Sequence, residues 1–258
     1  MRKGLLILWR IWFYVLAAIP VIVFFIPIAL FLVFPNGYHY VFWLARNVWA
    51  PFVLGGMGFW VKKTNTFPEE GKSYMLIANH TSFIDIMVIL RLRKTPFVFV
   101  GKKELVQIPI FGFIYKRAAI MVDRSSSKSR YEVYVRAQKV ISKGYSVCIF
   151  PETEYIDESI ILNPFKQGAF KLAIEHELPL LPMAFLDCKR KFPWYTTHGY
   201  PGELRVKALE VIPTTEMNEK NISILQEETH QQIKSALLDD PKGHTEEAIS
   251  VWKKQQLD

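Results

Sequence analysis

The sequence predicts an α/β protein in which an N-terminal membrane helix or helical hairpin precedes a mixed, largely parallel sheet flanked by helices. Two observations indicate this arrangement. Two apolar stretches dominate residues 1–61. Beyond residue 61, short apolar runs typical of strands alternate with longer runs of helical periodicity, which is the pattern of a single α/β domain. We therefore expect a membrane-embedded segment over residues 1–61 and one α/β domain over residues 62–258.

The first apolar stretch has the length and composition of a membrane segment. Residues 11–45 contain no formally charged side chain, and the run up to Phe34 is long enough to cross about 30 Å of hydrocarbon. Arg2, Lys3 and Arg10 precede the run and no small-residue cleavage site follows it, so we expect a retained segment rather than a removable signal peptide. The alternative is a buried hydrophobic helix of a soluble core.

The second apolar stretch, residues 41–61, is interrupted by Arg46, Pro51 and a glycine-rich run. A single crossing and a shallow helical hairpin both fit this pattern. Basic residues on both flanks, including Lys62 and Lys63, favour the hairpin, with both of its ends and the following domain on the cytoplasmic side.

Strands and helices are expected to alternate through the α/β domain. The candidate strands cover residues 74–78, 97–100, 119–122, 146–150, 180–185 and 204–209. The candidate helices cover residues 84–92, 131–142 and 167–176, and two polar amphipathic helices are expected over residues 216–238 and 245–254.

Composition limits the class of partner. The chain has 258 residues, of which 50% are hydrophobic, and a formal charge of +8. This charge favours a phospholipid surface, a phosphorylated substrate, an acidic carrier or nucleic acid. Nucleic acid is the least favoured, because the aromatic residues gather in the apolar segment rather than along a basic stripe. Neither the two cysteines, Cys148 and Cys188, nor the scattered histidines have metal-ligand spacing, so we expect no metal and no cofactor.

Polar clusters follow four of the candidate strands, where the carboxyl ends of parallel strands would meet at one edge of the sheet. The clusters are Asn79-His80, Lys102-Lys103-Glu104, Asp123-Arg124 and Pro151-Glu152. A base, cations and a carboxylate would meet there. The simpler interpretation of the lysines and of Arg124 is a solvated surface, and that of Pro151-Glu152 is an ordinary strand end.

His80 and Asp85 form the most informative pair. On a regular helix, which turns about 100° per residue, side chains five positions apart point in different directions. His80 must therefore precede the helix, which we expect to begin near Ser82. Asp85 would then lie in the first turn and hold one imidazole nitrogen, leaving the other to accept a proton as a general base. Since no G-x-S-x-G motif is present, the proton should come from a substrate hydroxyl. The structural alternative is a capping box, with Ser82 at the N-cap and Asp85 at N3.

Asn79-His80 followed after four residues by Asp85 resembles the N-H-x4-D motif of the glycerolipid acyltransferases, the 1-acylglycerol-3-phosphate acyltransferase family. Further blocks follow in the family's order: residues 112–124 ending in Arg124, F-P-E at residues 150–152, F-K-Q-G-A-F at 165–170 and L-P-L-L-P at 178–182. The resemblance covers residues 75–185. The family's third block usually reads F-P-E-G-T-R, whereas acidic residues follow Glu152 here and the arginine is missing.

The resemblance implies a membrane-bound acyltransferase. It would transfer a fatty acyl group from acyl-CoA or acyl carrier protein to a lysophospholipid, foremost 1-acyl-sn-glycerol 3-phosphate, with His80 and Asp85 as catalytic residues. The candidate substrate-binding residues are Asn79, Lys102, Arg124, Glu152 and Lys166. Because the third block departs from the family pattern, another lysolipid, such as a lysoaminolipid or a lipid A precursor, stays open as the acceptor. A non-enzymatic membrane adaptor is the alternative from another class.

Overall fold

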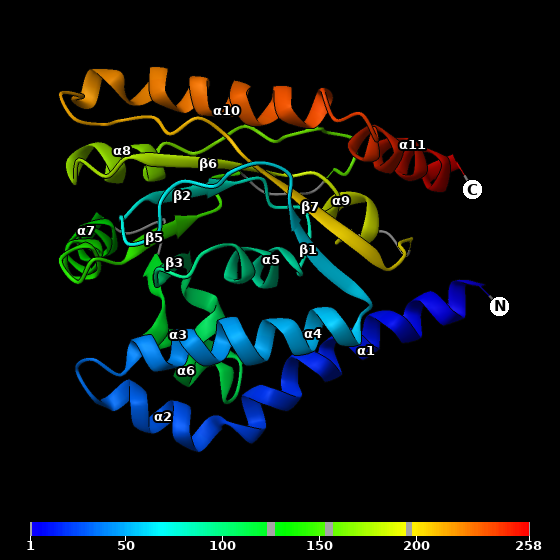
Figure 1. Cartoon of the computed structure of the whole chain (residues 1–258), viewed down its shortest axis with the longest axis horizontal. Helices are drawn as coiled ribbons and strands as arrows, with labels where there is room; N and C mark the ends of the chain where they lie inside the picture. Colours follow the sequence, from blue (N-terminus) through cyan, green and yellow to red (C-terminus); the bar gives the residue numbers. More distant parts are fainter. Residues whose placement is uncertain (1, 123–126, 153–156, 195–197, 258) are drawn as a thin grey trace.

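The computed structural model describes residues 2–122, 127–152, 157–194 and 198–257, with Arg2, Lys3, Lys102, residues 127–130 and Leu257 described by their main chain only. A helical hairpin packs against one side of a seven-stranded sheet, and two long C-terminal helices lie on the other side (Figure 1). The predicted α/β fold is therefore confirmed.

The N-terminal segment is a hairpin of two helical arms. The first arm comprises α1 (Arg2–Val23) and α2 (Phe25–Val33), which are separated at Phe24, four residues after Pro20. The chain then reverses, and α3 (Tyr38–Leu44), a π-helical turn η1 (Ala45–Trp49) and α4 (Ala50–Gly56) return beside it. Within the described residues, Gly4–Val23 is the one helical stretch long and apolar enough to cross a membrane.

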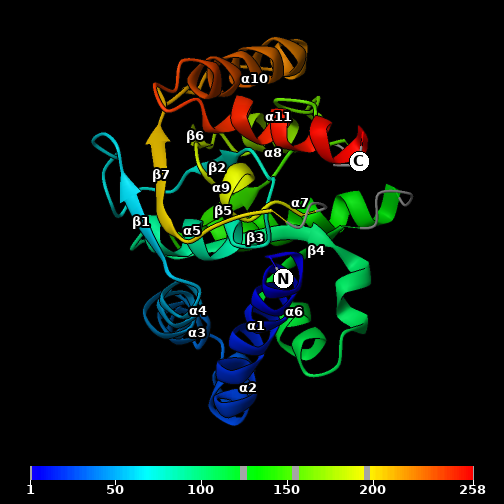
Figure 2. The same cartoon turned by 90° about the vertical axis from the view of Figure 1, so that its right-hand side faces the viewer.

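Two tryptophan side chains bind the two arms together. Trp49 Nε1 donates to the carbonyl of Ala17 at 2.9 Å, and Trp12 Nε1 donates to that of Gly56 at 3.1 Å. Figure 2 shows the hairpin projecting beneath the sheet, with α6 (Phe111–Ala118) beside it.

The sheet has the order β1-β7-β6-β2-β5-β3-β4, and every neighbouring pair is parallel except β6 with β7. The strands are β1 (Phe59–Lys63), β2 (Met75–Ala78), β3 (Phe97–Lys102), β4 (Ile120–Val122), β5 (Ser146–Ile149), β6 (Leu180–Phe185) and β7 (Gly202–Ala208). The central strand β2 is buried on both faces: Leu76 and Ala78 pack on the hairpin side, whereas Met75 and Ile77 pack on the side of the C-terminal helices. This alternation follows from the two-residue period of a strand.

The remaining helices cover the two faces of the sheet. They are α5 (Asp85–Leu92), a 3₁₀ turn η2 (Lys103–Gln107), α7 (Ser127–Ile141), α8 (Gly168–Glu175), α9 (Cys188–Lys191), a 3₁₀ turn η3 (Glu219–Asn221), α10 (Ile222–Leu238) and α11 (His244–Leu257). Helix α5 contacts α4 on the hairpin side, and α10 packs on β6 and α8 on the opposite side.

Four elements differ from the sequence-based expectation. Strand β1 was not predicted, and the boundary expected between residues 61 and 62 falls inside it. The short helices α6 and α9 were also not predicted. The helix expected to begin at residue 216 begins at Ile222, after a 3₁₀ turn capped by Asn218.

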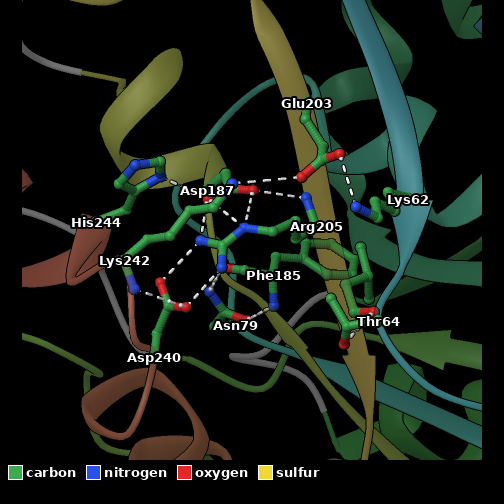
Figure 3. A network of polar contacts seen from close by, with 11 residues as sticks. Lys62, Thr64, Asn79, Phe185, Asp187, Glu203, Arg205, Asp240, Lys242 and His244 are labelled. Atoms are coloured by element: carbon green, nitrogen blue, oxygen red, sulfur yellow. Dashed lines mark hydrogen bonds and ion pairs between the residues drawn. The ribbon is translucent and has the colours of Figure 1, made fainter.

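A buried ionic network fastens the C-terminal helices to the sheet (Figure 3). Arg205 on β7 donates from Nη2 to Asp187 at 2.6 Å and from Nη1 to Asp240 at 2.6 Å. His244, the first residue of α11, contacts the same Asp187 carboxylate at 2.5 Å. Because Asp187 directly precedes α9, the network also fixes the start of that helix.

Candidate active site

His80 and Asp85 are in direct contact at the carboxyl end of β2. His80 Nδ1 lies 2.9 Å from Asp85 Oδ2, and the same oxygen accepts the main-chain N–H groups of Thr81 and Ser82 at 2.8 and 2.9 Å. Asp85 is fully buried, whereas the His80 side chain is 25% exposed. A carboxylate only accepts hydrogen bonds, so Nδ1 carries the proton and Nε2 is left as the acceptor.

The capping box expected as the alternative is only half formed: Asp85 Oδ2 accepts the N–H of Ser82, but the N–H of Asp85 bonds to the main-chain carbonyl of Ser82 at 3.3 Å and not to its hydroxyl. Helix α5 begins at Asp85 rather than near Ser82, its N-cap position is Ile84, and no side chain caps it. The Ser82 hydroxyl instead donates to the main-chain carbonyl of Phe192. The carboxylate of Asp85 therefore bonds to both the loop and His80, and the helix predicted over residues 84–92 begins one residue later, three residues after the start near Ser82 that the capping box requires.

Two aromatic rings enclose the imidazole of His80. The Phe150 ring stacks on it with 4.1 Å between centroids and 13° between planes, and Trp194 presents its edge at 4.5 Å and 82°. These contacts, with the bond to Asp85, leave the ring little freedom to rotate. Neither Phe150 nor Trp194 was predicted as a site residue.

Glu152 connects the end of β5 to the main chain of His80. Its Oε1 accepts the N–H of His80 at 2.5 Å, and its Oε2 accepts the N–H and side-chain amide of Asn163 at 3.0 and 3.1 Å. Burial raises the pKa of the Glu152 carboxyl, while the N–H donors of His80 and Asn163 oppose that rise. The carboxylate thus fixes where the loop bearing His80 begins.

Asn79 faces away from this group. Its side-chain amide donates to the carbonyl of Phe185 at 3.1 Å and accepts the N–H of the same residue at 2.8 Å. The amide thereby ties the end of β2 to the end of β6, and its predicted contact with substrate stays a prediction.

His80 opens onto a large apolar cavity of about 1530 Å³. Its walls come from both arms of the hairpin, including Phe24 and Tyr38, and from the sheet, including Phe99. A few polar side chains, among them Glu152 and Lys166, line the same cavity. A mostly apolar chamber lined by a few polar groups suits an amphipathic ligand.

The structure places one of the three cationic side chains that were predicted to bind substrate. Lys166 is exposed and lines the cavity with His80. Lys102 ends β3, and its side chain lies outside the described part of the structure. Arg124 also lies outside the described residues. The structure thus brings His80, Asp85, Glu152 and Lys166 together, and the roles of Lys102 and Arg124 stay predictions.

Comparison with known proteins identifies the family. The family model described as Acyltransferase matches residues 59–186. The chain is 30% identical over 185 residues to a 1-acyl-sn-glycerol-3-phosphate acyltransferase of Cocos nucifera, an alignment that covers 69% of this chain and 59% of that protein. It is 26% identical over 178 residues to 1-acyl-sn-glycerol-3-phosphate acyltransferase beta of Homo sapiens, covering 66% and 62%.

A solved structure shares the fold. The crystal structure of the 1-acyl-sn-glycerophosphate (LPA) acyltransferase PlsC from Thermotoga maritima superimposes with a TM-score of 0.71 at 20% identity, covering 93% of this chain and 97% of that one. The alignments with the two sequence relatives span about six-tenths of their length. The family predicted from the sequence blocks is confirmed: the chain belongs to the acyltransferase family of the 1-acyl-sn-glycerol-3-phosphate acyltransferases.

Proposed function

We propose that the protein transfers a fatty acyl group from an acyl thioester to the free hydroxyl of a lysophospholipid, foremost 1-acyl-sn-glycerol 3-phosphate, giving phosphatidic acid. The observation that carries this proposal is the His80–Asp85 pair, which opens onto an apolar cavity able to receive an acyl chain. The names of the sequence relatives support the choice of acceptor.

His80 acts as the general base. Its Nε2 takes the proton of the acceptor hydroxyl as the oxygen bonds to the thioester carbonyl carbon. The resulting tetrahedral species then expels the thiolate with cleavage of the C–S bond, and the imidazolium returns the proton to sulfur. Asp85 stabilises the imidazolium and keeps Nε2 turned toward the hydroxyl. Such positioned base catalysis contributes about 10²- to 10⁴-fold.

The oxyanion of the tetrahedral species needs donors from elsewhere. The N–H groups of Thr81 and Ser82 already bond to Asp85, and that of Ile84 bonds to the Ser82 hydroxyl at 3.3 Å. Part of the stabilisation in the proposed mechanism therefore comes from groups beyond this loop.

The N-terminal apolar helix is consistent with membrane association. An acceptor that keeps its acyl chain in the bilayer would reach the cavity through the hairpin, whose two arms form part of the cavity wall. We place the α/β domain on the cytoplasmic side because basic residues flank both ends of the hairpin.

A second acceptor class is favoured by one observation, the missing arginine after Glu152. The acidic residues that follow Glu152 would repel a phosphomonoester, so Lys166, Lys102 and Arg124 would have to hold the phosphate. A lysolipid whose head group carries a cation would suit the acidic segment better.

The experiment is a matrix of acceptors and donors. Purified protein in phospholipid vesicles is supplied with 1-acyl-sn-glycerol 3-phosphate, a lysoaminolipid or a lipid A precursor, each with acyl-CoA or with acyl-acyl carrier protein. Formation of phosphatidic acid from the first acceptor, lost in His80→Ala, is the expected result. Transfer to another lysolipid alone would replace the acceptor, and transfer to none of them would support the adaptor alternative.

A further inference from the structure

Arg10 lies on the apolar helix α1, yet its guanidinium faces the α/β domain. Nη2 donates to the carbonyl of Pro193 at 2.6 Å and Nη1 to that of Trp194 at 3.4 Å, and Cζ lies 5.0 Å from the centroid of the Phe192 ring. Arg10 therefore fixes which face of α1 is turned to the domain.

Residues 192–194, which Arg10 holds, touch the loop between β2 and α5. The carbonyl of Phe192 accepts the hydroxyl of Ser82, and the Trp194 ring lies against both His80 and Phe83, with centroids at 4.5 and 5.9 Å. One short segment thus contacts the base, the loop between His80 and Asp85, and the membrane helix.

Aromatic packing adds a second link between α1 and the same segment. Trp9 and Phe13 contact the Phe192 ring at centroid distances of 5.2 and 5.0 Å, and Phe13 also contacts Phe83 at 6.2 Å. Phe13 and Phe192 are buried. Helix α1 therefore contacts the segment through buried aromatic rings as well as through Arg10.

We propose that Arg10 is a positioning residue. Through residues 192–194 it couples the packing of the membrane helix α1 against the α/β domain to the orientation of the His80 ring. Asp85 fixes one nitrogen of the imidazole and Phe150 covers a face of the ring, whereas Trp194 joins the ring to the segment that Arg10 holds on α1. Loss of the Arg10 bonds releases the carbonyls of Pro193 and Trp194 from α1 while Phe192 stays packed on the helix, so the Trp194 ring shifts against His80. A displacement of about 1 Å in a reacting group lowers turnover by up to about 10²-fold. This inference rests on the proposed role of His80 as the base.

The test uses variants of the full chain in vesicles, assayed with 1-acyl-sn-glycerol 3-phosphate and acyl-CoA. Arg10→Met keeps the length of the side chain and removes its donors, whereas Arg10→Lys keeps the charge and one group of donors. Trp12→Phe is the matched control, because Trp12 lies half a turn away on α1 but bonds to Gly56 of α4. We expect kcat to fall about tenfold in Arg10→Met with KM unchanged within twofold, partial recovery in Arg10→Lys, and kcat within twofold of the parent protein in Trp12→Phe.

Non-additivity separates positioning from general destabilisation. If Arg10 acts through Trp194, combining Arg10→Met with Trp194→Phe lowers kcat no further than the more damaging single change. The inference would be overturned if the double variant lost kcat by the product of the two single losses. It would also be overturned if Arg10→Met had the same kcat as Trp12→Phe. If Arg10→Met does not fold, the same double-mutant comparison is made with Arg10→Lys and Trp194→Phe, and the same two outcomes apply. Loss of transfer in His80→Ala together with full activity in Arg10→Met defeats this inference alone, whereas full activity in His80→Ala defeats the proposed function.

Discussion

The main-chain N–H of His80 lies 2.5 Å from Oε1 of Glu152, so a side chain at the end of β5 fixes the main chain at the end of the adjacent strand β2. The candidate base is thus held from two directions: its ring by Asp85 and its main chain by Glu152.

Replacing Glu152 by alanine should destabilise the protein. The change leaves the buried N–H of Asn163 and the partly buried N–H of His80 without their acceptor, and an unsatisfied buried group costs about 1–3 kcal/mol. Thermal unfolding followed by circular dichroism measures the effect. Glu228→Ala, at an exposed position of α10, is the control and should leave the unfolding midpoint nearly unchanged. Equal midpoints for the two variants would show that the Glu152 bonds contribute little.

Replacing Asp85 by asparagine should lower kcat by about 10²-fold or more in folded protein. Asparagine keeps an acceptor for the loop but removes the charge that stabilises the imidazolium and orients its nitrogens. Steady-state transfer kinetics measure the loss, with Asp239→Asn at an exposed site as the control. If Asp85 served only the local main chain, stability would fall by about 1 kcal/mol and turnover would persist.

Replacing Arg205 by methionine should loosen the C-terminal helices. The change leaves the carboxylates of Asp187 and Asp240 buried without their cation, which costs about 3–5 kcal/mol. Amide hydrogen exchange should then rise across α10 and α11. Lys207→Met lies on the same strand with an exposed side chain and should leave the exchange unchanged. Unchanged protection in Arg205→Met would contradict the role given to this network.

Acidification should destabilise the protein through His198. Burial, and to a smaller extent the nearby Arg190 and Arg10, lower the pKa of His198 to about 4, while Glu247 opposes the shift. An unfolded histidine titrates near 6.5. Between about pH 6.5 and pH 4 the unfolded chain therefore binds a proton that the folded chain does not, and stability falls with pH by up to about 1.4 kcal/mol per unit.

The variant His198→Gln isolates this contribution. Its unfolding midpoint should fall less than that of the parent protein between pH 7 and pH 5. An equal fall in both proteins would assign the acid sensitivity to other groups.

The sequence predicted the central strands well and the edges of the fold less well. Strand β6 is an uninterrupted buried run, so its range was predicted to the residue. Strand β1 was missed because Phe59, Trp60 and Val61 continue directly from the apolar stretch of the hairpin. Only the pairing of β1 with β7 distinguishes it from a membrane segment, and that pairing joins residues far apart in the chain.

The site was predictable where its chemistry is local. His80 and Asp85 lie five residues apart, and their contact follows from the loop that joins β2 to α5. Nothing in the sequence around Trp194 indicates a site residue, because it follows the last of the family's sequence blocks. Its contact with His80 arises only when the chain folds. Arg10 was expected to mark only a basic flank of the membrane segment, and its contact with the carbonyls of residues 193 and 194 depends on how α1 packs.

The most direct test of the account is the rate of acyl transfer to 1-acyl-sn-glycerol 3-phosphate by His80→Ala, compared with the parent protein and with His39→Ala at the tip of the hairpin. Both variants are first shown to be folded and bound to vesicles. We expect transfer to be lost in His80→Ala and retained in His39→Ala. Transfer by folded His80→Ala at the rate of the parent protein would contradict the assignment of His80 as the base.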